Sequence, residues 1–120
     1  MKKTFCFDID NTICVTTKNN YNKSKKIVSK IKTINNLHKK GHYIILFTAR
    51  FMGRNKNNSI KAKKEGYKFT YSQLKKWGLN FDELHMGKPS ADYYIDDKSL
   101  NYNKNWHLIL KRKYLKKLRG

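Results

Sequence analysis

Four short apolar runs separate longer polar stretches of the chain, and each has the length of a β-strand. They cover residues 4–7, 43–47, 84–86 and 93–95. Short continuous apolar runs between polar or turn-forming residues are typical of strands buried in a parallel sheet. The first run is unbroken, which predicts that it lies in the centre of the sheet.

Three other segments predict helices. Between Ser24, as N-cap, and Lys40, apolar residues recur at helical spacing, and Gly41 follows as a stop signal. A short helix is predicted over residues 70–77, and an amphipathic helix over residues 105–118. Residues 51–68 are rich in Lys, Asn and Gly without a clean apolar period, and predict a basic flap with a helical turn near residues 59–64.

Polar residues that could take part in catalysis or binding follow the predicted strands. Asp8 and Asp10 come after the first, Thr48 after the second and Lys88 after the third, while an acidic pair, Asp96 and Asp97, follows the fourth. Strand, helix and strand of these lengths form a right-handed unit with parallel strands, whose C-terminal ends meet at the edge where ligands bind. Converging carboxylates usually hold a divalent cation, so the pattern predicts a Mg²⁺ site beside a candidate nucleophile.

The same stretches resemble the motifs of the haloacid dehalogenase (HAD) superfamily of phosphatases. Four motifs occur in order: Asp8-Ile-Asp10-Asn-Thr12, Ile44-Ile-Leu-Phe-Thr48, Gly87-Lys88-Pro89 and Tyr94-Ile-Asp96-Asp97. Thr48-Ala-Arg50 with the last two motifs also resembles small capless members associated with capsular and surface polysaccharide synthesis. The resemblance implies a Rossmann-like three-layer α/β sandwich with a mostly parallel central sheet. One loop and one helix consume the residues between the first two motifs, so no cap domain is expected.

The resemblance also implies an activity, a Mg²⁺-dependent phosphomonoesterase that forms an aspartyl-phosphate intermediate. Asp8 would be the nucleophile and Asp10 the general acid and base, while Thr48 and Lys88 would bind the phosphoryl group. The metal ligands would be Asp8, Asp10, Asp96 and Asp97. By the narrower resemblance, the substrate is a phosphorylated sugar or small polyol intermediate, nucleotide- or sugar-linked forms included. Candidate substrate-binding residues on or beside the flap are Arg50, Arg54, Asn55, Asn57 and Asn58.

Each motif taken alone also has a purely structural interpretation. Asp-x-Asp-x-Thr is often a turn or helix-cap sequence, because Asp and Thr satisfy free backbone donors. Thr48 would then be an ordinary N-cap, and the acidic pair at Asp96 a solvated turn. The occurrence of all four motifs in order favours the catalytic interpretation.

The charge of the chain raises the question of a polyanionic partner. There are 28 Lys and Arg residues against 8 Asp and Glu, for a formal net charge of +20. Such a balance suggests nucleic acid or an acidic surface. Abundant Lys, Asn and Ile with little Arg instead favours the composition bias of AT-rich genomes, and no stretch interleaves aromatic and basic residues convincingly enough for strand stacking. Two alternatives remain open: a nucleic-acid phosphatase, and a non-catalytic nucleic-acid-binding module on the same fold.

The remaining expectations concern organisation. A chain of 120 residues predicts a single domain over residues 1–120. Neither a signal peptide nor an apolar run of membrane-spanning length is seen, which predicts a cytoplasmic protein without a membrane span. Cys and His residues lack zinc-site spacing. Without a cap the site would be open, to a large substrate or to a second subunit that covers it in a homo-oligomer.

Overall fold

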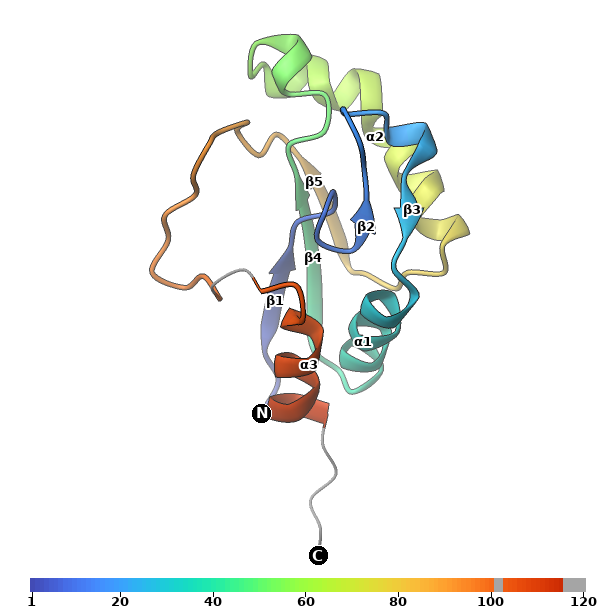
Figure 1. Cartoon of the computed structure of the whole chain (residues 1–120), viewed down its shortest axis with the longest axis vertical. Helices are drawn as coiled ribbons and strands as arrows, with labels where there is room; N and C mark the ends of the chain where they lie inside the picture. The colour runs from blue at the N-terminus through green and yellow to red at the C-terminus, as the bar shows by residue number, and fades with distance from the viewer. Residues whose placement is uncertain (101–102, 116–120) are drawn as a thin grey trace, which may run out of the picture.

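A three-stranded parallel sheet forms the centre of the computed structural model, which describes residues 1–100 and 103–115. Its strands are β1 (Thr4–Phe7), β4 (Tyr43–Thr48) and β5 (Glu83–Met86), in the order β1-β4-β5 (Figure 1). The central strand is therefore β4, and the prediction that the first strand is central is wrong for the described residues. β1 lies at an edge, and its residues Thr4 and Cys6, whose side chains share one face of the sheet, are exposed.

Among the described residues, three helices accompany the sheet: α1 (Val28–Lys39), α2 (Ser59–Lys76) and α3 (Trp106–Leu110). A π-helical turn, η3 (Lys111–Leu115), continues α3, and residues 116–118 of the predicted C-terminal helix lie outside the described residues. Short elements fill the connections, and β2 (Cys14–Val15) pairs antiparallel with β3 (Lys25–Lys26). Two single 3₁₀ turns are η1 (Tyr21–Lys23) and η2 (Gly53–Asn55).

One hydrophobic core joins the sheet to the helices. Phe7, Leu46 and Leu84 lie in register on the same face of the three strands. They pack in one cluster with residues from all three helices: Ile31, Ile34, Leu37, Leu74, Trp106 and Leu110. The opposite face is covered less, since Cys6 is exposed and Ile45 is only half-buried.

Helix α2 replaces two elements that the sequence predicts separately. Residues 59–68 of the predicted flap and residues 70–76 of the predicted short helix are parts of one 18-residue helix. The Asn58 side chain caps it by accepting the Lys61 backbone N–H at 3.1 Å. Its buried stripe consists of Ala62, Gly66, Thr70 and Leu74. Because three of these four residues are small or polar, the stripe does not stand out as an apolar period.

Helix α1 begins later than predicted. Ser24 is not its N-cap, because Lys25 and Lys26 pair with β2 before the helix starts at Val28. Ile27 takes the cap position without a side-chain hydrogen bond, and Val28 is 64% exposed. The buried stripe then follows as expected, through Ile31, Ile34 and Leu37.

The predicted fourth strand at residues 93–95 does not form. Residues 90–100 are all exposed, and Ile95 keeps 98% of its surface accessible. Figure 1 shows this orange segment arching away from the sheet before the chain returns to α3. An apolar run becomes a strand only when a neighbouring strand pairs with it, and here it has no pairing partner among the described residues.

The fold class predicted from the sequence is confirmed. The molecule is a small Rossmann-like α/β domain with a parallel sheet flanked by helices, and no cap domain is evident in the part of the chain that the structure describes. Within residues 1–100 and 103–115, none of the helices combines the length and the apolar character needed to cross a bilayer.

Gly66 in the middle of α2 provides a test of this packing. Replacing glycine by alanine inside a helix normally stabilises it by about 1 kcal/mol. Here a Cβ atom would overlap the ring of Phe51. We therefore expect Gly66→Ala to lower the free energy of unfolding by about 1–3 kcal/mol in urea titrations. Ser72→Ala, at an exposed position of the same helix, should change it by only a few tenths of a kcal/mol.

Candidate active site at the strand ends

The C-terminal ends of the three strands carry three of the predicted site residues. Asp8 follows β1, Thr48 ends β4, and Lys88 comes two residues after β5. The Lys88 backbone N–H donates to the Thr48 carbonyl at 3.1 Å, and its Nζ lies 3.9 Å from Oδ2 of Asp8. The predicted convergence of these strand ends at one rim is therefore present in the structure.

Asp8 is a partly buried carboxylate at the rim, and its pKa is shifted. Its side chain is 35% exposed, and its Oδ1 accepts the Ile9 backbone N–H at 2.8 Å. Burial raises the pKa of the Asp8 carboxyl, and the nearby Asp10 adds to this, while Lys88 works in the opposite direction. Perturbed carboxyl groups of this kind cluster at functional sites.

Asp10 is held by a buried arginine. Nε of Arg50 donates to Oδ1 and Oδ2 at 3.1 and 2.9 Å, and Nη2 donates to Oδ1 at 2.9 Å. Thr16 adds a hydroxyl hydrogen bond to Oδ1 at 2.6 Å. Such a fork of charge-assisted hydrogen bonds fixes both the position and the plane of the Asp10 carboxylate.

The Arg50 side chain, predicted to bind substrate, is buried and makes its contacts within the protein. It is only 1% exposed, its Nη1 donates to Oε1 of Gln73 at 2.6 Å, and its guanidinium lies 4.9 Å from the centre of the Tyr21 ring. Arg50 is a positioning residue for Asp10. The partners Thr16, Tyr21 and Gln73 carry no local sequence signal, because only the tertiary fold brings them to Arg50.

Thr48 also has a different role from the one predicted. Its side chain is fully buried, and its Oγ1 accepts the Arg50 backbone N–H at 3.1 Å. In this structure the hydroxyl presents no surface to a phosphate. Through its side chain and its carbonyl, Thr48 instead fixes the backbone at Arg50 and Lys88.

Asp96 and Asp97 do not join the rim. Both are exposed on the segment that leaves the sheet (Figure 1). Oδ1 of Asp96 accepts the Lys98 backbone N–H at 2.9 Å. This bond, and a further one to Asp97, lower the pKa of the Asp96 carboxyl. Across residues 1–100 and 103–115, no three His, Cys, Asp or Glu side chains are grouped to hold a metal ion, so Asp96 and Asp97 are not gathered with Asp8 as the predicted metal site requires.

The rim nevertheless fits Mg²⁺ through Asp8. Magnesium is usually bound by one or two carboxylates, with water and substrate phosphate as further ligands. Asp8 offers a partly exposed carboxylate. Partial burial disfavours its negative charge, and a bound cation would offset this unfavourable effect. The carboxylate of Asp10 already accepts hydrogen bonds from Arg50 and Thr16, so Asp8 is the carboxylate available to the metal.

The three asparagines proposed for substrate recognition form hydrogen bonds to backbone groups. Nδ2 of Asn55 donates to the Phe51 carbonyl at 2.8 Å, and Asn58 caps α2. Oδ1 of Asn57 accepts the Ser90 backbone N–H at 2.9 Å, which fastens the segment after Lys88. Asn57 and Asn58 are nevertheless exposed. Arg54 is exposed too: its side chain is 48% accessible and lies 3.7 Å from Glu65.

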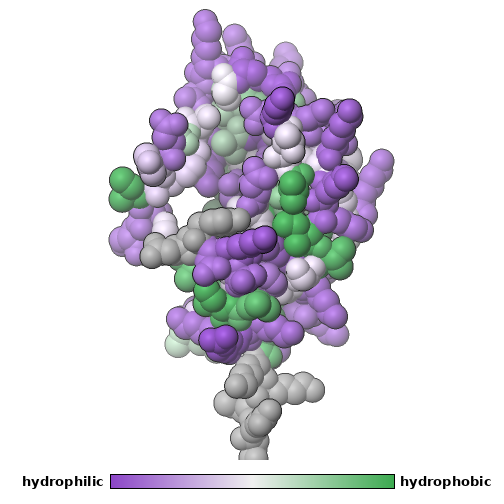
Figure 2. Space-filling view, viewed as in Figure 1, coloured by the Kyte–Doolittle hydropathy of each residue, from purple (hydrophilic) through white to green (hydrophobic). Residues whose placement is uncertain are grey.

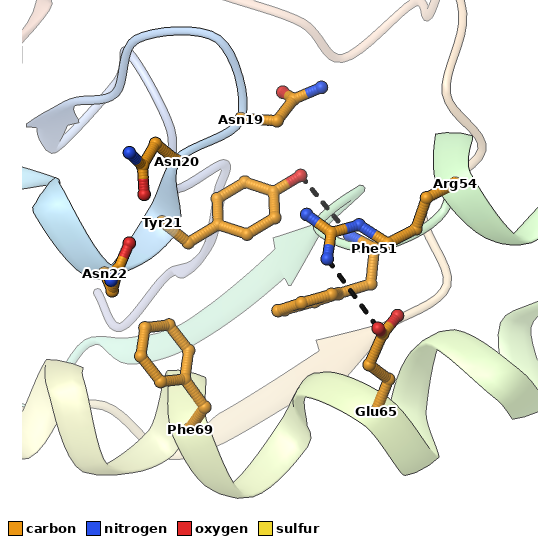
Figure 3. A pocket seen from close by; sticks show the side chains of 8 residues that line it. All are labelled: Asn19, Asn20, Tyr21, Asn22, Phe51, Arg54, Glu65 and Phe69. Atoms are coloured by element: carbon orange, nitrogen blue, oxygen red, sulfur yellow. Dashed lines mark hydrogen bonds and ion pairs between the residues drawn. The ribbon is translucent and has the colours of Figure 1, made fainter.

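Arg54 lines an open pocket of about 400 Å³ (Figure 3). Its guanidinium lies 4.7 Å from the centre of the Phe51 ring, which packs against Tyr21 at 4.8 Å. The remaining lining residues are Glu65, Phe69 and the amides Asn19, Asn20 and Asn22. Since Arg50 stacks on Tyr21, one ring separates this pocket from the residue that holds Asp10.

Comparison with known proteins bears on the fold. No protein-family model matches the chain, and no curated protein matches it. The chain is similar to the crystal structure of a structural-genomics target from Vibrio cholerae, with 25% identity and a TM-score of 0.75. The match covers 94% of this chain and 98% of that one. The likeness therefore extends over the whole α/β domain.

Proposed function

We propose that this chain is a Mg²⁺-dependent phosphomonoesterase that forms an aspartyl-phosphate on Asp8. The observation that carries the proposal is the pairing of Asp8 with Lys88 at one rim, 3.9 Å apart. A phosphate monoester is a dianion, so a carboxylate can approach it only when positive charge is close. Lys88 supplies one such charge, and Mg²⁺ bound at Asp8 would supply screening of the phosphoryl oxygens.

The reaction divides into two displacements at phosphorus. Asp8 attacks the phosphorus, the bond to the leaving alcohol breaks, and the alcohol oxygen takes a proton from Asp10, which carries that proton at the start of the cycle and becomes the carboxylate. Water then attacks the phosphorus and loses a proton to Asp10, and the bond to Asp8 breaks to release inorganic phosphate. A positioned acid–base residue of this kind contributes about 10²–10⁴-fold to rate.

The surroundings of Asp10 support the second displacement. Its oxygens accept hydrogen bonds from Arg50 and Thr16, so the carboxylate is arranged as an acceptor. A carboxylate in this state can take the proton of the attacking water. Arg50 thus acts through Asp10, by fixing its orientation toward the rim.

A phosphorylated sugar or small polyol is the proposed substrate. The pocket in Figure 3 supports this choice, because it combines aromatic rings with amides and the Arg54–Glu65 ion pair. Rings of Phe51 and Phe69 suit the apolar face of a sugar, and the polar groups suit its hydroxyls. The Arg54–Glu65 pair has no net charge, which favours an uncharged organic moiety over a second anionic group.

The test is release of phosphate from a generic aryl phosphate by the purified chain. We expect turnover with Mg²⁺, loss of turnover when a chelator removes the metal, and recovery when Mg²⁺ is restored. A panel of sugar and polyol phosphates should then show higher kcat/KM than the aryl phosphate. A chain that hydrolyses no phosphomonoester with any divalent cation contradicts the proposal.

A further inference from the structure

A ladder of basic and aromatic side chains runs along the outer side of α2. Lys63, Tyr67, Tyr71 and Lys75 follow one another at four-residue spacing, which places them on one face of the helix. Lys63 lies 5.9 Å from the Tyr67 ring, and Lys75 lies 5.4 Å from the Tyr71 ring. At 1.5 Å per residue, the ladder is about 18 Å long.

The aromatic rings of the ladder form a continuous platform. Tyr67 and Tyr71 are stacked with their centres 6.1 Å apart and their planes 22° apart. Phe81, from the loop before β5, meets Tyr71 edge to face at 5.7 Å, and Lys75 lies 4.8 Å from its ring. Tyr71 is 40% exposed, while Tyr67 and Phe81 are half-buried against the core, so Tyr71 is the most accessible ring of the platform.

The charged residues of α2 around the platform are almost all positive. α2 contains six lysines and a single acid, Glu65. Glu65 is turned toward Arg54, at the pocket of Figure 3. The nearest acids from another element follow Phe81: Asp82 accepts the Ile44 N–H, and Glu83 pairs with His85. Hydrophilic side chains cover most of this view, including the part over α2 (Figure 2).

We propose that this ladder binds single-stranded nucleic acid. Proteins that bind single strands without sequence preference stack the unpaired bases on aromatic rings and contact the phosphates with basic residues. An anionic membrane would instead call for protruding Trp, Phe or Leu on the face opposite the lysines. On α2, that opposite stripe, with Ala62 and Leu74, is buried against the domain. The proposal concerns binding and does not rest on the phosphatase activity.

The ladder proposal is tested by fluorescence anisotropy of a labelled oligothymidylate with the full chain. Tyr71→Ala should weaken binding about 5- to 100-fold, because stacking on an aromatic ring is lost. Tyr71→Phe retains the ring and should bind like wild type. Tyr93→Ala, which removes an equally large ring that is 85% exposed elsewhere, should also bind like wild type.

A salt series separates the lysines from the rings. Lys75→Gln should reduce the dependence of log Kd on log salt by about 0.7, the share of one phosphate contact on a single strand. Circular dichroism shows whether Tyr71→Ala is folded, and Lys75→Gln tests the same surface without removing a packed ring. Equal affinity of wild type and Tyr71→Ala would overturn the proposal. So would binding to anionic phosphatidylserine vesicles without binding to the oligonucleotide.

Discussion

Asp8→Asn is expected to reduce phosphate release from phosphomonoesters by at least about 10⁴-fold, the size of loss seen when a catalytic nucleophile is removed. The amide has nearly the shape of the carboxylate but cannot form the acyl phosphate. Asp92→Asn is the matched control, since Asp92 is an exposed acid on the segment after Lys88 and should leave turnover unchanged. Residual activity of Asp8→Asn within tenfold of wild type would exclude Asp8 as the nucleophile.

The same variant should be more stable than wild type at neutral pH in the absence of divalent cations. The pKa of Asp8 is raised in the folded protein by burial, so ionisation of Asp8 disfavours the folded state. This destabilisation is present above the raised pKa and disappears below the ordinary value of 3.8, where the group is protonated in both states. Thermal unfolding should therefore show a higher Tm for Asp8→Asn at pH 7, and a difference that shrinks in acid.

Arg50→Met is expected to lower the free energy of unfolding by about 3 kcal/mol. Removing one partner of a buried ion pair costs about 3–5 kcal/mol, because the other charge is left without compensation. The lower end applies because the Asp10 side chain remains 20% exposed. Since Arg50 holds Asp10, kcat should also fall while KM changes little. Urea unfolding and steady-state kinetics measure the two effects.

Arg54→Met is the matched control for Arg50→Met. Both guanidinium groups lie over the Tyr21 ring, but Arg54 pairs with Glu65 at the surface. An exposed ion pair contributes only about 0–1 kcal/mol, so this variant should keep nearly all of its stability. Equal destabilisation by the two variants would contradict the distinction drawn between a positioning arginine and a pocket arginine.

The rim could be predicted from the sequence because it depends on local rules. Apolar runs give the strands β1, β4 and β5, and parallel pairing brings the residues after them together. That is why the pairing of Asp8 with Lys88 follows from motif order alone. The polar loop between residues 15 and 23 could not be interpreted in this way, since Thr16 and Tyr21 acquire their roles only when Arg50 arrives from β4.

Two errors have a common physical cause. The length of α2 was hidden because its buried stripe uses Ala62, Gly66 and Thr70, which do not signal a helical period. The apolar run at Tyr93–Ile95 signalled a strand, yet pairing decides whether such a run is buried, and Ile95 is almost fully exposed. In both cases the hydrophobic pattern predicts a different structure from the one observed, because packing against the rest of the domain determines which element forms.

The ladder on α2 was also within reach of the sequence. Lys63, Tyr67, Tyr71 and Lys75 share one face only when these residues form one helix, whereas the sequence predicts a flap over residues 51–68. Because α2 is one helix, some of the lysines that give the chain its high charge lie at fixed positions beside stacked aromatic rings.

The central claim, that Asp8 is phosphorylated during turnover, is tested most directly by trapping the enzyme during the reaction. The chain is quenched in acid while it turns over a phosphomonoester with Mg²⁺, digested and analysed by mass spectrometry. The account predicts one phosphoryl group on the peptide containing Asp8, sensitive to hydroxylamine and missing from Asp8→Asn. Turnover without a phosphorylated Asp8 peptide, or with the phosphoryl group on another residue, would contradict it.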